Sequence, residues 1–109
     1  MANNIPLIVF PVQDLEKAKS FYNTYLGTEP YIDGSYYVGY KLNGLEVGLN
    51  PNDTVIISYI DVDDIAASLE TLTEVGAEVI KEPTDVGGGL LIAQVEIEGN
   101  IMGLRQQAT

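Results

Sequence analysis

The hydrophobic pattern at the start of this chain predicts a strand that leads into a helix. Residues 5–12, IPLIVFPV, are apolar and rich in β-branched side chains, which is typical of a buried strand. Residues 15–26 place apolar side chains at helical spacing. Asp14 stands just before this stretch as a suitable N-cap, and Gly27 stands just after it, where helices commonly end.

Short strands and tight turns are predicted after this helix. The runs PYI, SYYVGYKL and LEVGL are rich in aromatic and β-branched residues, as strands are. The dipeptides Asp33-Gly34 and Asn43-Gly44 separate the runs, and both are strong hairpin-turn signals. Residues 50–53, NPND, have the composition of a linker. The chain up to this linker is therefore expected to form strand, helix and three strands.

The same order of elements then returns. Residues 54–62, TVIISYIDV, predict a strand. Residues 64–76 predict a helix that Asp63 or Asp64 caps and Gly76 ends. The segments VQDL and VDDI match at an offset of 50 residues, and the phrases NGLEVGL and EGNIMGL match at an offset of 55. The difference is most simply placed in KEPTDVGGG of the second half. The prediction is a single α+β domain over residues 1–109 with tandem βαβββ modules, about 4–50 and 54–106.

Composition narrows the chemistry open to this chain. It contains no cysteine and no histidine, which excludes disulfides, histidine-ligated metals and any Ser-His or Cys-His nucleophile. The net charge is −11, from 16 acidic and 5 basic residues, so nucleic acid and anionic membranes are poor partners. A cationic ligand would be attracted. No targeting or membrane-spanning segment is recognised, and a cytoplasmic location is expected.

The order and spacing of these segments resemble the vicinal-oxygen-chelate superfamily, the group of glyoxalase I, the extradiol dioxygenases and the bleomycin-resistance proteins. PVQDLEKAKSFYNTYLG resembles that family's first strand–helix unit, IDVDDIAASLETLTEVGAEV its second, and EPTDVGGGLLIAQVEIEGNIMGL its closing hairpin. The resemblance covers nearly the whole chain. It implies two curved sheets around a central cleft.

The same resemblance locates the positions at which metal-dependent members hold a divalent ion. Two lie on the first strands of the modules, seven residues before the helix cap, where this chain has Leu7 and Ile57. Two lie on the last strands, usually as glutamates, where this chain has Gly48 and Gly103. None of these side chains offers a donor atom. We therefore expect no metal and no cofactor, and a metal-dependent glyoxalase I ranks last among the functions considered.

Side chains alternate between the two faces of a strand, and this alternation predicts which residues of each module line the cleft. This face combines an apolar floor with a few polar groups at its rim, as small-molecule sites do. Residues of the other parity, such as Phe10, Val47 and Leu104, are expected to pack under the helices. The predicted ligand-binding residues are Leu7, Val9, Glu46, Gly48, Asn50, Ile57, Tyr59, Asp61, Ile101, Gly103 and Arg105, together with Tyr37 and Tyr40.

These features favour a metal-free protein that binds a flat or cationic small molecule, as the bleomycin-resistance branch of the superfamily does. The resemblance also implies a homodimer. Tyrosine rings could stack such a ligand, although tyrosine also favours half-buried sheet surfaces without any ligand. The alternative function is a metal-independent lyase or isomerase that uses Glu46 or Asp61 as its base. A regulatory or interaction module has no specific support.

Two glycine features complete the expectations. A glycine inside a strand often marks the close approach of another group, and at Gly48 and Gly103 we expect that group to be a ligand. Residues 87–89, GGG, are expected to form a flexible connection that could act as a lid. The acidic run DVDD, at 61–64, opens a helix and is explained by capping.

Overall fold

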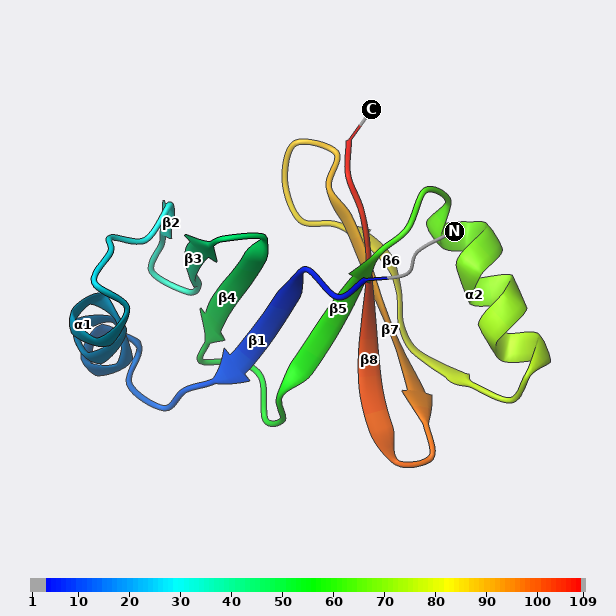
Figure 1. Ribbon diagram of the computed structural model, residues 1–109. Helices are drawn as coiled ribbons and strands as arrows, with labels where there is room; N and C mark the ends of the chain where they lie inside the picture. Colours follow the sequence, from blue (N-terminus) through cyan, green and yellow to red (C-terminus); the bar gives the residue numbers. More distant parts are fainter. Residues whose placement is uncertain (1–3, 109) are drawn as a thin grey trace. The chain divides into compact units, whose positions relative to one another are not determined.

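The computed structural model describes residues 4–108 and divides into two compact units. One unit comprises Pro6–Ile57, and the other comprises the residues from Ser58 onward together with residues 4 and 5. The boundary lies after Ile57, the first residue of the strand that opens the second repeat. Each contains the order strand, helix and three strands, which confirms the α+β class and the repeated βαβββ pattern. Figure 1 shows the two sets of elements, coloured along the sequence.

The strands of each unit hydrogen-bond in an equivalent order. The first unit contains β1 (Leu7–Pro11), α1 (Leu15–Leu26), β2 (Ile32–Asp33), β3 (Val38–Leu42) and β4 (Leu45–Asn50), with strand order β2-β3-β4-β1. The second contains β5 (Ile57–Asp61), α2 (Ile65–Glu74), β6 (Glu78–Asp85), β7 (Leu91–Ile97) and β8 (Asn100–Gln106), with strand order β6-β7-β8-β5. In each unit the first and last strands are parallel and the others are antiparallel.

Helix α1 begins at its predicted cap, and α2 begins at Asp64, one of the two predicted candidates. The Asp14 carboxylate accepts a hydrogen bond from the backbone N–H of Lys17, and the Asp64 carboxylate accepts one from Ala67, each at 3.0 Å. These bonds satisfy donors that a helix start would otherwise leave without partners. Helix α1 ends at Gly27, whose φ of 70° is the left-handed conformation that glycine adopts without strain.

Two predicted strands have different bounds in the structure. The run SYYVGYKL becomes strand only from Val38, because the Gly34 N–H donates to the Tyr37 carbonyl at 2.9 Å and closes a turn there. Strand β6 continues through KEPTD, so the longer second half adds its residues to the β6–β7 hairpin. Gly87–Gly89 form the turn of this hairpin, which is closed by the Val86 N–H donating to the Leu90 carbonyl at 2.9 Å. The connection is a hydrogen-bonded turn between paired strands.

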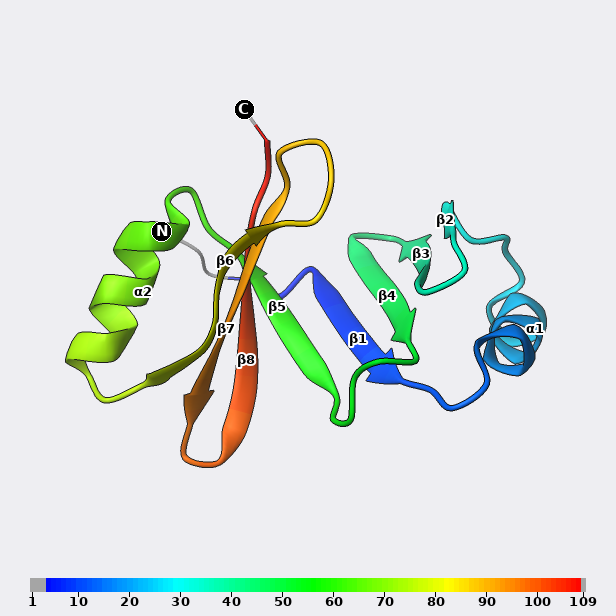
Figure 2. The ribbon, with the colours of Figure 1, turned by 180° about the vertical axis from the view of Figure 1, so that it is seen from behind.

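Each unit buries an apolar cluster between its helix and one face of its sheet, as the predicted strand parity requires. Figures 1 and 2 show α2 on one side of the β6–β8 strands, and α1 beside β3 and β4. The first cluster is built on Leu15, Val38, Tyr40, Val47 and Leu49, with Phe10 and Val12 packed against it. The second is built on Ile65, Leu69, Ala77, Ala93, Val95 and Leu104, with Val62 and Met102 packed against it.

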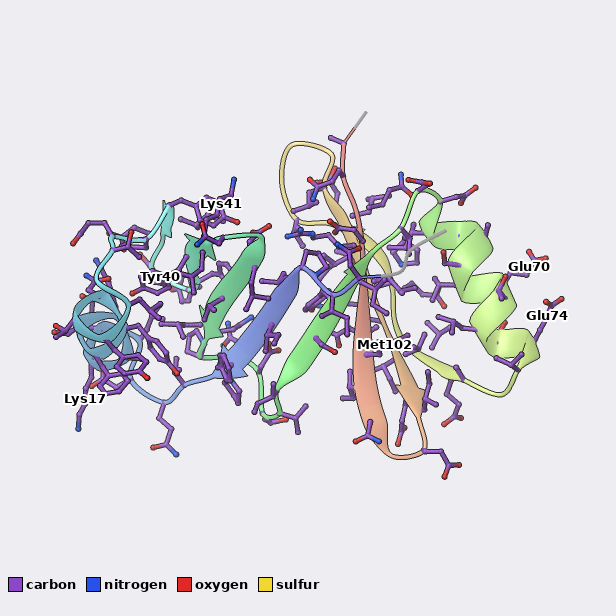
Figure 3. The ribbon with its side chains drawn as sticks, viewed as in Figure 1. Lys17, Tyr40, Lys41, Glu70, Glu74 and Met102 are labelled. Atoms are coloured by element: carbon purple, nitrogen blue, oxygen red, sulfur yellow. The ribbon has the colours of Figure 1, made fainter. Side chains whose placement is uncertain are left out.

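Tyr40 belongs to the first of these clusters, so its predicted place in the ligand site is wrong. Its side chain is fully buried, and Figure 3 shows it between the strands and α1. The hydroxyl lies 2.7 Å from Asn23 Oδ1 and 3.2 Å from the Lys19 carbonyl, both on α1. Tyr40 therefore fixes the helix to the sheet. Alternation alone left open which face of β3 the helix would cover.

No helix in residues 4–108 is long and apolar enough to cross a membrane.

Replacing Tyr40 with phenylalanine is expected to destabilise the protein by about 0.5–1.5 kcal/mol, because two acceptors on α1 lose their donor. Urea denaturation at neutral pH measures this difference. Tyr36→Phe is the matched control, since the Tyr36 side chain is 75% exposed. An equal loss in both variants would contradict the assigned role of Tyr40.

Burial raises the pKa of Tyr40 above its ordinary value of 10.0, because the folded state favours the neutral phenol. The contribution of a group with a raised pKa is fully present below its unfolded value and is lost as the pH rises through its folded value. The difference in stability between the wild type and Tyr40→Phe should therefore shrink in alkaline solution above about pH 10. A difference that grows there would contradict this sign.

Candidate functional site

The strand register places the predicted residues of the first unit on one face, opposite α1. Strands β1 and β4 pair with Leu7 beside Glu46, Val9 beside Gly48, and Pro11 beside Asn50. The alternate residues Phe10, Val47 and Leu49 pack in the helix-side cluster. The first unit thus presents Leu7, Val9, Glu46, Gly48 and Asn50 together on its non-helical face.

The second unit repeats this arrangement. Strands β5 and β8 pair with Tyr59 beside Gly103 and Asp61 beside Arg105. On its other edge, Gly103 pairs with Gln94 of β7, which the sequence interpretation missed. Ile57 and Ile101 lie two residues before Tyr59 and Gly103, so alternation places them on the same non-helical face.

The four positions at which the resemblance would place metal ligands do not fit a metal here. Leu7 and Ile57 are buried aliphatic side chains, 7% and 2% exposed. Gly48 and Gly103 have no side chain, and both are buried. Among residues 4–108 there is no group of three or more acidic side chains placed to hold a metal ion, and the chain has no histidine or cysteine. A divalent ion would find no donor set at these positions.

A tyrosine ring occupies the space beside Gly103. A Cβ atom added at this glycine would lie 2.7 Å from Tyr59 Cγ, and even closer to two further ring carbons. Tyr59 is 5% exposed, and its hydroxyl accepts a hydrogen bond from Gln94 Nε2 at 3.0 Å. The ring therefore lies flat on the glycine and is held at its far end by the neighbouring strand.

The first unit uses the same device with a different tyrosine. A Cβ atom added at Gly48 would lie 2.7 Å from Tyr37 Cζ and still closer to the Tyr37 hydroxyl oxygen. Gly39, the register partner of Gly48, also lies under this ring, with Tyr37 Cε2 3.3 Å from its added Cβ. In the second unit the covering ring comes from the strand parallel to β8, whereas in the first it comes from the turn before β3.

These rings correct the expectation about the two glycines. The close approach that a strand glycine signals is present, but the approaching group is the protein's own tyrosine. Such a glycine costs roughly 0.5–1 kcal/mol relative to alanine, whereas burying a large aromatic side chain contributes about 1.5–3 kcal/mol. The ring therefore more than offsets the glycine. Aromatic cover of this kind is a known way to stabilise a glycine in a sheet.

Arg105 and Asp61 form the strongest charged contact on the face of the second unit. Arg105 Nε donates to Asp61 Oδ1 at 2.7 Å, and Nη2 donates to Oδ2 at 3.2 Å. Arg105 is 6% exposed, and the Asp61 side chain is 34% exposed. A buried guanidinium needs such pairing. Asp61 therefore serves as the counter-ion of Arg105, with a hydrogen bond to each of its oxygens.

Glu46 is also engaged, through a group that the sequence interpretation left out of the site. The Tyr31 hydroxyl donates to Glu46 Oε1, and Lys41 Nζ lies 4.6 Å from the centre of the Tyr31 ring. Lys41 pairs with Glu46 in the β3–β4 register. Tyr31 precedes the two-residue strand β2, so no alternation pattern linked it to Glu46. The tyrosine-rich stretch to which Tyr31 belongs was the sequence feature that could have marked it as a candidate site residue.

Comparisons with known proteins identify the fold. No protein-family model and no curated protein matches the sequence. A variant methylmalonyl-CoA epimerase from Streptomyces coelicolor, in complex with 2-nitronate-propionyl-CoA, has a TM-score of 0.83 at 16% identity, with 100% of both chains covered. A hypothetical protein from Bacillus halodurans C-125 has a TM-score of 0.81 at 14% identity, with 97% of this chain and 95% of that chain covered.

A third solved structure carries the superfamily in its description. It is a glyoxalase/bleomycin resistance protein/dioxygenase superfamily member from Vibrio splendidus 12B01, with a TM-score of 0.73, 17% identity, and coverage of 92% of this chain and 95% of that chain. At such identities the likeness establishes the fold. This chain has the vicinal-oxygen-chelate fold, as the resemblance of its segments implied.

Alanine at the two covered glycines should destabilise the protein, although alanine normally stabilises a strand relative to glycine. We expect Gly103→Ala to cost about 1–3 kcal/mol, because the clashing atoms lie at the base of the Tyr59 ring and cannot swing away. Gly48→Ala should cost less, since the clash is with the far end of Tyr37. Urea denaturation measures both.

Gly39→Ala is the matched control for these variants. Its added Cβ meets its nearest atom at 3.3 Å, so a small shift of the Tyr37 ring can accommodate it. The expected order of destabilisation is Gly103→Ala, then Gly48→Ala, then Gly39→Ala. A Gly103→Ala variant that is as stable as the wild type would show that the Tyr59 ring does not occupy this space.

Proposed function

We propose that this chain is a metal-independent, cytoplasmic small-molecule-binding protein of the glyoxalase/bleomycin-resistance type, and that it sequesters a flat or cationic ligand. The observation that carries the proposal is a ring-covered glycine in both units, at the positions where the family resemblance would place a metal-binding carboxylate. This replacement removes the Lewis acid on which the metal-dependent chemistry of the fold relies. It leaves aromatic faces and hydrogen-bonding groups on the surfaces that would hold the substrate.

The polar groups on these faces support recognition of a flat ligand. Tyr31 and Tyr37 present rings in the first unit, and Gln94 lies beside the Tyr59 hydroxyl in the second. Rings of this kind stack planar molecules and attract cations. The net charge of −11 favours a cation at longer range. Lys41 over Tyr31 already shows a cation held by a ring of this surface.

A metal-independent lyase or isomerase ranks below binding. This alternative needs Glu46 or Asp61 as a base. Both Asp61 oxygens accept hydrogen bonds from Arg105, and Glu46 accepts one from Tyr31. A general base needs an oxygen directed at the proton that it removes. The described contacts direct these carboxylates at groups of the protein.

Metal analysis tests the first part of the proposal. Protein is purified without a histidine tag, dialysed against Zn²⁺, Ni²⁺ or Fe²⁺, and then freed of unbound metal. Inductively coupled plasma mass spectrometry should find far less than one equivalent of metal per chain. None of these ions should raise the melting temperature. One equivalent of tightly bound metal would overturn the metal-independent assignment.

Ligand titration tests the second part. Proflavine serves as the flat cation, naphthalene-2-sulfonate as the flat anion, and tetramethylammonium as a cation without a ring. We expect calorimetry to show the order proflavine, then the sulfonate, then tetramethylammonium. Tyr37→Leu should weaken proflavine binding about tenfold, the loss of one stacked ring.

Tyr36→Leu is the matched control for this titration, because it removes an exposed tyrosine next to Tyr37 in the sequence. It should bind proflavine as the wild type does. Equal weakening in both variants, or stronger binding of tetramethylammonium than of proflavine, would contradict ring stacking as the basis of recognition. Absence of any binding by the wild type would contradict sequestration of flat ligands.

We also propose that the chain forms a homodimer through the outer face of α1. Phe21 and Tyr25 are 61% and 77% exposed, and their rings stack with centroids 6.0 Å apart. Two adjacent exposed rings form the kind of apolar surface that marks an interaction site.

Tyr25→Lys should convert the dimer to a monomer, because a charge would replace an aromatic side chain in the interface. Light scattering after size exclusion gives the mass. Val75→Lys, the equivalent exposed position of the second unit at 79%, should leave the mass unchanged. A monomeric wild type, or a dimer that survives Tyr25→Lys and dissociates in Val75→Lys, would contradict this interface.

A further inference from the structure

A pocket lies on the helical side of the second unit, between α2 and the strands β5 and β8. Its volume is about 400 Å³, within the range of pockets that hold small molecules. Figure 3 shows Met102, one of its lining residues, on β8. The apolar part of the lining is formed by Ile60, Val62, Leu72, Met102 and Leu104.

The first unit fills the equivalent space with aromatic rings. Phe10 and Tyr22 stack with centroids 6.4 Å apart, and both pack against the first apolar cluster. At the repeat offset of 50 residues, the second unit has Ile60 and Leu72 at these positions. Both are smaller than their counterparts. The pocket therefore corresponds, by this offset, to the space that the Phe10 and Tyr22 rings occupy in the first unit.

The end of this pocket at which α2 begins is lined by acidic side chains. Asp63 and Asp64 belong to its lining, and helix α2 contains no basic residue. The start of a helix carries about half a positive charge, which the carboxylate of Asp64 alone outweighs. Figure 3 shows Glu70 and Glu74 on the outer side of the same helix. The local charge therefore favours a cation at the end of the pocket where α2 begins.

We propose that this pocket binds a small aromatic molecule that carries an amine cation. The ring lies between α2 and the sheet, where Ile60 and Leu72 leave the space that Phe10 and Tyr22 fill in the first unit. The ammonium group lies at Asp63 and Asp64. This site is on the opposite face of the sheet from Tyr59 and Arg105, so it does not depend on the function proposed above.

Three probes of one size test the chemistry of the pocket. They are phenethylammonium, the neutral 2-phenylethanol, and the anionic 3-phenylpropionate. We expect calorimetry to show the tightest binding for the ammonium and the weakest for the carboxylate. The double variant Asp63→Asn/Asp64→Asn should abolish this order while it retains binding of the alcohol. Asparagine is itself a good N-cap, so the start of α2 is preserved.

A filling variant tests the location. Ile60→Phe/Leu72→Tyr places the residues of the first unit into the second and should weaken phenethylammonium binding at least tenfold without loss of fold. Val75→Tyr adds an aromatic ring at an exposed position of the second unit and should change nothing. Full binding by the filled and folded variant would overturn the proposal.

The remaining outcomes are equally decisive. Failure of all three probes to bind the wild type at millimolar concentration would overturn the proposal. If the filled variant instead loses self-association that the wild type shows, the pocket holds a side chain of a second copy, and the small-molecule assignment is wrong. Two-dimensional NMR shifts confined to α2, β5 and β8 on adding phenethylammonium would support the assignment.

Discussion

A tyrosine ring that lies on a strand glycine is the contact on which both units depend. Gly103 lies under Tyr59, and Gly48 lies under Tyr37. A side chain at either glycine would have to share its space with the ring, so there is no room for the carboxylate that the family resemblance would place there. The packing of the sheet face thus leaves no metal donor at these two positions. The proposed metal-independent function depends on the same packing that stabilises the fold.

The two units solve the same packing problem with different residues. The ring over Gly48 comes from the segment before β3, whereas the ring over Gly103 comes from β5. On the helical side the first unit is filled by aromatic rings, and the second leaves a pocket lined by aliphatic side chains. The repeat therefore maintains the backbone and the glycines while the side chains around them differ. Binding properties can then differ between two units of one fold.

Much of the fold could be predicted from the sequence, because hydrophobic periodicity and turn-forming residues are local features. The cap at Asp14 and the order of elements were predicted and are confirmed, and of the two candidates Asp63 and Asp64 the structure selects Asp64 as the second cap. Tyr40 was misplaced because alternation gives two faces but does not say which one the helix covers. The occupant of the glycine sites also escaped prediction, since the contacts of Tyr37 and Tyr59 depend on side-chain direction across strands. The pocket could in principle have been predicted, because Ile60 and Leu72 stand at the repeat positions of the larger Phe10 and Tyr22.

The most direct test of the link between glycine and ring is a double-mutant cycle at Gly103 and Tyr59. Unfolding free energies are measured for the wild type, Gly103→Ala, Tyr59→Ala and the double variant. If the ring occupies the space, Gly103→Ala destabilises the wild type but is neutral or stabilising in the Tyr59→Ala background, where only the strand preference for alanine remains. The same loss of stability in both backgrounds would contradict the account, because the cost of a side chain at residue 103 would then have nothing to do with Tyr59.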